Sequence, residues 1–238
     1  MRVLMVIPAY NEEESILQTV QQIQSYREMC DFTLDYVVVN DGSTDNTQIL
    51  LERYQFNHVH LIMNLGIGGA VQTGYKYAKL HNYDIAVQFD GDGQHDICSL
   101  KTLIQPIIDG QADLTVGSRF IDGKISDFQT TFMRRLGIKI ISWMIRTVTG
   151  KKILDTTSGY RAANKQVIEY FSQRYPTKYP EPESIVHLLK RKFKIKECAV
   201  NMYERQAGAS SITPIKSIRY MCEVCSAILV TALMKEGD

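Results

Sequence analysis

Residues 83–92 read Tyr-Asp-Ile-Ala-Val-Gln-Phe-Asp-Gly-Asp, an apolar run that ends in two carboxylates, and this stretch decides the fold. The run has the length and apolar character of a buried strand. Asp90 and Asp92 follow it two residues apart, where like charges repel unless a cation lies between them. Hard oxygen ligands favour Mg²⁺ or Mn²⁺, and so sparse a pair leaves coordination positions for a diphosphate. A simple acidic Asp-Gly turn is the alternative interpretation.

Similar apolar runs alternate with amphipathic stretches along the first half of the chain, which is the pattern of an α/β layer. We expect strands at residues 2–7, 34–40, 58–63, 84–89 and 113–117. Four of these runs are followed by polar clusters: Pro8-Ala-Tyr-Asn-Glu, Asn40-Asp-Gly-Ser-Thr-Asp, Asn64-Leu-Gly-Ile-Gly-Gly and Asp90-Gly-Asp. Because ligands of open α/β sheets bind outside the carboxyl ends of the strands, the four clusters indicate one site.

The second half of the chain is less regular. It predicts a helical segment at residues 131–149, a turn or strand at 159–161, a helix from about residue 183, a strand at 195–203 and a final helix from about residue 214. No repeat, linker or low-complexity tract separates the two halves. We therefore expect all 238 residues to form one domain.

Composition narrows the class of protein. The chain is 45% apolar and 22% charged with a net charge of +1, as expected for a soluble globular domain and not for a general nucleic-acid binder. The apolar start is interrupted by Pro8 and followed by acidic residues, so it does not read as a secretion signal. Five scattered cysteines indicate reduced thiols in a cytosolic protein.

Five motifs, taken together and in this order, resemble the family 2 glycosyltransferases of the GT-A fold: Pro8-Ala-Tyr-Asn-Glu-Glu, Val39-Asn-Asp-Gly-Ser-Thr-Asp, Asn64-Leu-Gly-Ile-Gly-Gly-Ala, Phe89-Asp-Gly-Asp-Gly-Gln-His and Thr157-Ser-Gly-Tyr-Arg. The chain looks most like the branch that glycosylates dolichyl and polyprenyl phosphates. The resemblance implies a Rossmann-like α/β domain with a mixed, mainly parallel sheet flanked by helices. Residues 1–118 would bind the nucleotide sugar and residues 119–238 the acceptor.

The resemblance also implies a donor site, a divalent metal and inversion at the anomeric carbon. The nucleotide sugar would be bound by Pro8, Tyr10, Glu12, Asp41, Gly68, Asp90 and Asp92. Asp41 would accept a hydrogen bond from the base, and Asp90 would face the ribose or sugar. Asp92 would be the principal ligand of Mg²⁺ or Mn²⁺, with Asp90 and Gln94 beside it. For Glu12, a carboxylate in the first turn of a helix is the alternative.

The acceptor decides which further residues matter. A phosphate monoester is already largely anionic at neutral pH, so it needs orienting cations and not a base. The resemblance implies such a set in Arg119, Arg134, Arg135, Arg161, Arg205 and Ser210. Arg134 and Arg135 could equally be solvated surface residues. Ser211 follows Ser210 where the family often has a basic residue, which leaves one cation fewer.

A saccharide hydroxyl acceptor would instead require a base. Asp155 matches a family position near the acceptor, and Glu181 and Glu183 lie where the family carries an acidic helix start. Asp155 or Glu183 would then be the base. Glu183 also has a structural interpretation, since an acid after Pro182 suits a helix N-terminus.

A lipid acceptor implies contact with a membrane surface. The longest charge-free apolar run near the C-terminus, residues 224–234, falls short of the roughly 20 residues needed to span a bilayer. Residues 132–146 mix large apolar side chains, one Trp and cations, which suits an anionic lipid interface, although a buried helix with basic ends would look similar. The apolar C-terminal helix could dock a small membrane protein or a second subunit. We expect peripheral attachment at the cytoplasmic face of the cell membrane.

The favoured function is transfer of a hexose or N-acetylhexosamine from a UDP-sugar to polyprenyl (undecaprenyl) phosphate, for cell-surface polysaccharide synthesis. The residues expected to act in catalysis are Asp92, Asp155, Glu183, Arg119 and Arg161. Two alternatives remain open. One is transfer to a saccharide hydroxyl with Asp155 or Glu183 as base, and the other is a non-catalytic subunit that binds a nucleotide sugar.

Overall fold

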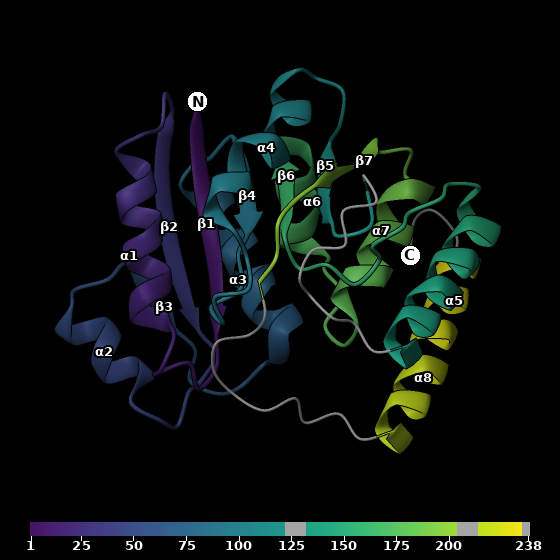
Figure 1. Cartoon of the computed structure of the whole chain (residues 1–238), viewed down its shortest axis with the longest axis horizontal. Helices are drawn as coiled ribbons and strands as arrows, with labels where there is room; N and C mark the ends of the chain where they lie inside the picture. Colours follow the sequence, from purple (N-terminus) through teal and green to yellow (C-terminus); the bar gives the residue numbers. More distant parts are fainter. Residues whose placement is uncertain (122–131, 204–213, 235–238) are drawn as a thin grey trace.

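The computed structural model describes residues 1–121, 132–203 and 214–234, and in α5 and α8 it describes side chains from residues 135 and 220 onward (Figure 1). The strands are β1 (Arg2–Ala9), β2 (Thr33–Asn40), β3 (His58–His60), β4 (Ile85–Gln88), β5 (Leu114–Ser118), β6 (Arg161–Asn164) and β7 (Ile195–Ala199). The helices are α1 (Ile16–Arg27), α2 (Thr47–Arg53), α3 (Gly66–Leu80), α4 (Leu100–Ile108), α5 (Phe132–Thr149), α6 (Lys165–Gln173), α7 (Pro180–Lys190) and α8 (Pro214–Leu233), with a 3₁₀ turn at Ile97–Ser99.

One mixed sheet runs through the described residues in the order β3-β2-β1-β4-β6-β5-β7. All neighbours pair in parallel except β6, which is antiparallel to both β4 and β5. The register of β1 with β2 pairs Pro8 with Val39, so these strands end at the same edge. The segments that follow β1, β2 and β4 are thereby brought together, as expected for parallel strands.

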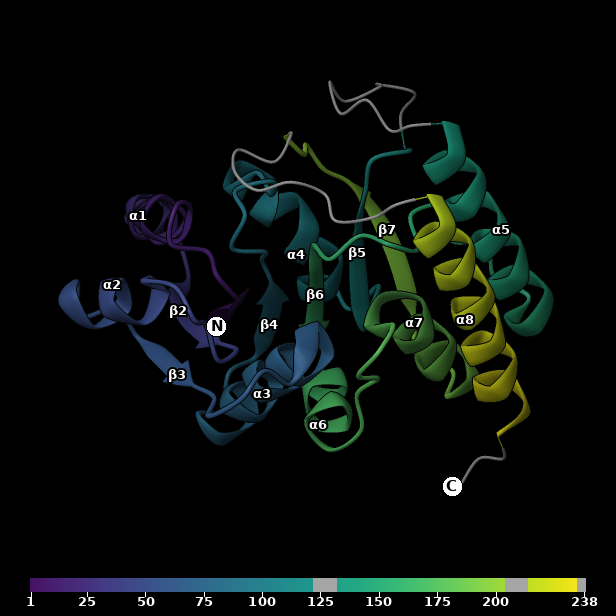
Figure 2. The same cartoon turned by 90° about the horizontal axis from the view of Figure 1, so that it is seen from below.

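Helices cover both faces of the sheet because its central strands are apolar on both sides. Along β1, Val3, Met5 and Ile7 pack into the core beneath α1 and α4, while Leu4 and Val6 pack against α3 and α6. Figure 2 shows the two layers, with α1 and α4 on one side of the strands and α3 and α6 on the other. The strands are continuous apolar runs for this reason.

A third core joins α5, α7 and α8 beside β7. Its buried side chains include Ile141 and Ile145 of α5, Ile185 of α7 and Val224 and Ile228 of α8. The two long helices α5 and α8 lie side by side in both views (Figures 1 and 2). None of the described helices is long and apolar enough to cross a membrane.

The structure confirms the mixed, mainly parallel sheet and the five strands expected in the first half. Four boundaries differ by three residues or more: β3 ends at His60, β6 ends at Asn164 instead of residue 161, β7 ends at Ala199, and α7 begins at Pro180 instead of near residue 183. Helix α6 was not expected from the sequence pattern. This nine-residue helix is too short to be stable alone, and it is held by packing its buried Phe171 into the core shared with α3.

Candidate active site

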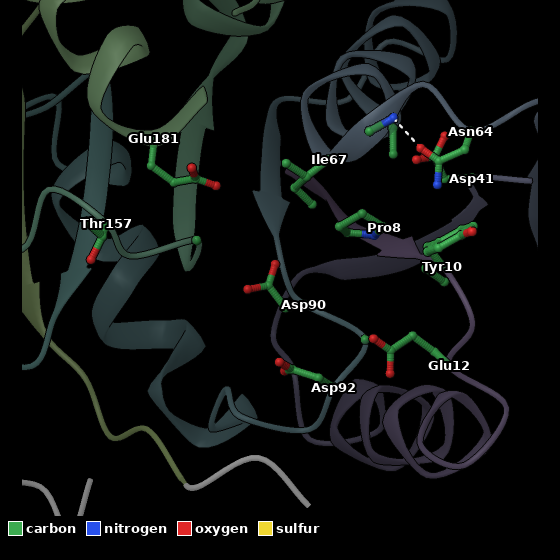
Figure 3. A pocket seen from close by; sticks show the side chains of 15 residues that line it. Pro8, Tyr10, Glu12, Asp41, Asn64, Ile67, Asp90, Asp92, Thr157 and Glu181 are labelled. Atoms are coloured by element: carbon green, nitrogen blue, oxygen red, sulfur yellow. Dashed lines mark hydrogen bonds between the residues drawn. The ribbon is translucent and has the colours of Figure 1, made fainter. Parts of the chain in front are cut away.

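A pocket of about 420 Å³ opens at the carboxyl ends of β1, β2 and β4 (Figure 3). Its walls come from the segments after these strands, from the start of α3, from residues 157–159 and from the first turn of α7. The lining residues are Pro8, Ala9, Tyr10, Glu12, Asp41, Asn64, Gly66, Ile67, Ala70, Asp90, Gly91, Asp92, Thr157, Gly159 and Glu181. Residues as far apart in the sequence as Pro8 and Glu181 therefore line one site.

Carboxylates dominate the charge of the pocket. Among the residues that the structure describes, five lining residues are carboxylates, namely Glu12, Asp41, Asp90, Asp92 and Glu181, and no Lys or Arg lines the pocket. An anionic ligand such as a diphosphate would be repelled here unless it entered with a cation. In the part of the chain that the structure describes, no three His, Cys, Asp or Glu side chains form a metal site. The residues thus fit a hard divalent ion that takes one or two protein carboxylates and completes its shell from the ligand.

One end of the pocket is formed by Tyr10, Asp41 and Asn64. Asp41 is buried, and its Oδ1 accepts a hydrogen bond of 2.7 Å from the Leu65 N–H. Burial raises the pKa of the Asp41 carboxyl, and the hydrogen bonds from Leu65 and Gly66 partly oppose this. Tyr10 keeps an exposed ring at the mouth, suited to contact with a flat ligand group.

Glu12 lies between this end and the Asp90 loop (Figure 3). Its carboxylate accepts from the Ser15 hydroxyl at 2.7 Å, and its backbone N–H donates to Thr47 Oγ1 at 2.9 Å. Helix α1 begins only at Ile16 and has no acid in its first turn. The alternative of a first-turn helix carboxylate is therefore wrong for Glu12.

The loop after β4 presents Asp90 and Asp92 to the pocket and is held by its own polar groups. The Gln94 N–H donates to Asp92 Oδ1 at 3.1 Å, and α1 reaches the loop through a bond from Thr19 Oγ1 to the Gly91 carbonyl. His95 accepts from the Asp90 N–H at Nδ1, which leaves its proton on Nε2, 3.5 Å from Asp90 Oδ2. Burial lowers the pKa of His95, so the ring stays neutral.

The opposite end of the pocket belongs to the second half of the chain. Here Thr157, Gly159 and Glu181 line the pocket, and the Glu181 side chain points into it from the side opposite Tyr10 (Figure 3). A Cβ on Gly159 would lie 2.7 Å from Asp90 Oδ2, so only glycine lets the backbone approach so closely. The buried Gln88 amide donates to Asp90 Oδ1 at 3.3 Å.

Of the residues expected at the donor site, the structure brings six to the pocket: Pro8, Tyr10, Glu12, Asp41, Asp90 and Asp92. It does not bring Gly68 there. A Cβ on Gly68 would lie 2.4 Å from the Pro176 carbonyl oxygen, so this glycine permits close packing of α3. Gln94 also lies outside the pocket lining, and its backbone links Asp92 to Tyr203.

Arg119 and Asp155 form a buried ion pair. Arg119 Nε and a terminal nitrogen donate to the two Asp155 oxygens at 2.7 and 2.8 Å, and Asp155 has no exposed surface. The same guanidinium donates to Thr157 Oγ1 at 3.2 Å, next to the pocket. Asp155 is not a lining residue, and an acid engaged in this way is poorly placed to remove a proton from a ligand.

Arg161 is also directed into the protein. Its guanidinium donates to the carbonyls of Ser158, Glu181 and Thr156 and to the Ser184 hydroxyl, at 2.7 to 3.3 Å. Only 1% of the residue is exposed. These bonds engage four of its five N–H donors within the protein, so the structure does not bring Arg161 to an acceptor.

The other predicted acceptor residues divide into three cases. Glu183 lies in the first turn of α7, as an acid suited to the helix dipole, and does not line the pocket. Arg135 lies exposed on α5. The side chain of Arg134, and Arg205 and Ser210 entirely, lie outside the described residues.

Sequence reasoning gave no role to His95 or Thr157, although both lie within quoted motifs, and it favoured Glu183 over Glu181. A better bound for the start of α7 would have identified Glu181. Helical residues two apart point about 200° away from each other, so only one of the two acids can face the pocket.

The chain is similar in sequence to known proteins. A family model described as "Glycosyl transferase family 2" matches residues 5–171. The chain is 31% identical over 221 residues to a UDP-N-acetylglucosamine–dolichyl-phosphate N-acetylglucosaminyltransferase from Methanococcus voltae, covering 83% of this chain and 84% of that protein. It is 33% identical over 172 residues to an undecaprenyl-phosphate mannosyltransferase from Micrococcus luteus, covering 68% and 66%.

A solved structure shares the fold. Glucosyl-3-phosphoglycerate synthase from Mycobacterium tuberculosis, in complex with Mn²⁺, uridine diphosphate and phosphoglyceric acid, superposes with a TM-score of 0.71. The match covers 99% of this chain and 80% of that one at 19% identity. The fold is thus that of the GT-A glycosyltransferases.

Proposed function

This chain belongs to glycosyl transferase family 2 and is a glycosyltransferase, and from that premise we propose that it transfers a hexose or N-acetylhexosamine from a UDP-sugar to polyprenyl phosphate. The observation that carries the proposal is the cluster of five carboxylates that lines the pocket at the carboxyl ends of β1, β2 and β4. Such a pocket suits a nucleotide diphosphate sugar that arrives with a divalent ion.

The donor would lie along the pocket with its base, its diphosphate and its sugar in that order. Tyr10 and Pro8 would contact the base, and the Asp41 carboxylate would accept a hydrogen bond from a uracil N–H. Asp90 and Asp92 lie in the middle of the pocket, where the diphosphate would pass (Figure 3). The sugar would then extend toward Thr157 and Glu181, on the acceptor side.

Asp92, with Asp90 beside it, would hold Mg²⁺ or Mn²⁺. When bound, the ion supplies positive charge that stabilises the departing UDP. The chain's own contribution is to orient these carboxylates through the Gln94 N–H and His95. An oxygen of the acceptor phosphate would attack C1 of the sugar from the face opposite UDP. The new C1–O bond would form as the bond to the UDP oxygen breaks, and the bonding pair would leave with UDP.

A phosphate acceptor needs no base, and the arrangement of acids agrees with this. Asp155 gives both oxygens to Arg119, and Glu183 lies outside the pocket lining. Among the residues that the structure describes, transfer to a saccharide hydroxyl therefore keeps Glu181 as the one candidate base on the acceptor side of the pocket. The two relatives named above are lipid-phosphate transferases by name, which favours the phosphate acceptor. Arg119, Arg134, Arg135 and Arg205 are the candidates to orient it.

A lipid acceptor calls for access to a membrane surface, and α5 offers one. Its outward face carries Leu136, Ile140 and Trp143, exposed by 43%, 40% and 65%. The exposed cations Arg135, Lys139 and Arg146 lie among them. Apolar anchors flanked by cations suit the interface of an anionic bilayer, so we place peripheral attachment here. Trp143→Ser should weaken sedimentation with phosphatidylglycerol vesicles several-fold while leaving UDP binding unchanged.

The first experiment incubates the protein with radiolabelled UDP-glucose or UDP-N-acetylglucosamine, Mn²⁺ and undecaprenyl phosphate in detergent. We expect label to enter the organic phase, to require the metal and to be released by mild acid, as a sugar linked through phosphate should be. Chelation by EDTA serves as the metal control. Release of UDP with label only in water-soluble saccharide would instead identify a hydroxyl acceptor. If no UDP is released, transfer to phosphate and transfer to a hydroxyl are both contradicted.

A further inference from the structure

We propose that Glu181 binds the donor sugar directly, and that the acidic wall it forms with Asp90 restricts the donor to uncharged hexoses and excludes uronic acids. The inference rests on the proposed function, because it assumes that a nucleotide sugar occupies the pocket. It adds the residue that contacts the sugar and the chemical class of sugar that this residue admits.

The position of Glu181 is fixed by its backbone. Its carbonyl accepts hydrogen bonds from Arg161 at 2.8 Å and from the Ser184 hydroxyl at 3.1 Å. Arg161 in turn binds the carbonyls of Ser158 and Thr156, on either side of Thr157. The first turn of α7 and the 156–159 segment are thus held as one unit. The Glu181 side chain leaves this unit toward the pocket, whereas its backbone is tied behind it (Figure 3).

The end of the pocket opposite Glu181 suits the nucleobase of the donor. Tyr10 and Asp41 lie at one end, Asp90 and Asp92 between, and Glu181 and Thr157 at the other (Figure 3). A nucleotide sugar is a linear ligand whose diphosphate separates the base from the sugar. With the base at Asp41 and the diphosphate at Asp92, the sugar hydroxyls therefore reach Glu181.

At the Glu181 end of the pocket, the polar side chains are mainly hydrogen-bond acceptors. The buried Gln88 amide donates to Asp90 at 3.3 Å, and Gly159 brings the backbone against the same carboxylate. Burial raises the pKa of Glu181, and the Arg161 charge opposes this shift. Carboxylates at such a site accept hydrogen bonds from sugar hydroxyls. A uronic acid would add a third carboxylate to Asp90 and Glu181, and no described Lys or Arg lines the pocket to pair with it. Like charges in one pocket discriminate against a ligand strongly.

The test is calorimetric titration without acceptor, in the presence of Mg²⁺, with UDP, UDP-glucose and UDP-glucuronate as probes. It compares the wild type with Glu181→Ala, Glu181→Gln and the control Glu183→Ala, an acid in the same helical turn that lies outside the pocket lining. We expect Glu181→Ala to weaken UDP-glucose binding about tenfold, the loss of one charge-assisted hydrogen bond. UDP affinity should stay within about twofold of the wild type in every variant.

For the charged sugar, we expect the wild type to bind UDP-glucuronate at least about tenfold more weakly than UDP-glucose. Glu181→Gln should narrow this gap by about threefold or more, since it removes one of the two repelling charges while keeping the shape of the side chain. Unchanged UDP binding in the same variants shows that the pocket is intact.

Two results would overturn the inference. The first is Glu181→Ala binding UDP-glucose as the wild type does, and the second is equal affinity of the wild type for UDP-glucose and UDP-glucuronate. Failure of the wild type to bind UDP at all would be a different result. It would contradict the UDP-sugar donor of the proposed function and not only the role of Glu181.

Discussion

The pocket and the segment behind it hold charge in opposite ways. In the pocket, Asp90 and Asp92 lie close together among five carboxylates. Behind it, the Arg119 and Asp155 charges are paired through a bidentate contact, and the Arg161 guanidinium is surrounded by carbonyls and a hydroxyl. The first arrangement is costly until a cation arrives, whereas the second is complete within the protein.

The difference separates binding residues from residues that hold the site in place. Carboxylates collected in one pocket indicate a ligand that brings a cation. An arginine held by the chain's own oxygens, as Arg161 is, indicates a scaffold for the loop that carries Thr157 and Gly159. Mutations in the two regions should therefore fail differently, with lost activity in the first and lost stability in the second.

The largest effect is expected at Asp92. Replacing it with alanine should reduce sugar transfer roughly a thousandfold, about 4 kcal/mol of lost charge stabilisation, because the divalent ion loses its main protein ligand. Initial rates of lipid labelling measure this, and circular dichroism checks the fold. The control is Asp109→Ala, an exposed carboxylate at the end of α4. Equal loss of activity in the control, or full activity in Asp92→Ala, would break the comparison.

Asp155→Asn should instead destabilise the protein by about 3–5 kcal/mol, because the buried Arg119 charge loses its partner. Urea denaturation gives the change in the free energy of unfolding. Asp109→Asn, on the surface, should stay within about 0.5 kcal/mol of the wild type. Wild-type stability together with lost transfer would show that Asp155 serves as a base and not as a structural partner.

Arg161→Met should cost about 2–3 kcal/mol of unfolding free energy, since it leaves buried carbonyls without donors. Chemical denaturation is again the measurement, with the exposed Arg53→Met as the matched control. A variant of normal stability that has lost only affinity for the acceptor phosphate would place Arg161 among the binding residues and contradict the comparison.

The smallest effect concerns pH. Burial raises the pKa of Asp41 above its ordinary value of 3.8, so on acidification its carboxylate is lost at a higher pH than usual. A protonated Asp41 cannot accept as well from a base N–H, and UDP affinity should therefore fall a few-fold as the pH is lowered toward the raised pKa. Titration calorimetry between about pH 7 and pH 5 measures the trend, since unperturbed aspartates remain ionised there. Asp41→Asn should bind UDP more weakly and lose this part of the pH dependence. Identical profiles for the two proteins would exclude Asp41 as the titrating group.

Much of the fold followed from local pattern. Apolar runs of strand length alternating with amphipathic stretches predicted the first five strands, because a buried parallel strand is apolar on both faces. The pattern failed for α6, whose nine residues are stabilised by packing against α3 and not by their own propensity. It also misplaced the start of α7 by about one turn, because residues 180–183, Pro-Glu-Pro-Glu, suit more than one first helical position.

The donor side of the site could be read from the sequence, since Pro8 lies at the end of β1 and Tyr10, Asp41, Asp90 and Asp92 lie in the segments after strands whose ends meet at one edge of the sheet. The acceptor side could not. Whether Glu181 or Glu183 faces the pocket depends on the rotational phase of α7, which its packing against α8 and α5 sets. Whether Arg119 and Arg161 bind a ligand or the protein depends on which oxygens lie within reach. Local pattern is enough to find the carboxylates and the sheet edge on which they lie, because neighbours along a strand stay neighbours in the fold. The partners of the arginines and the acid at the far wall follow from the packing of the elements, because those contacts join residues that are far apart in the chain.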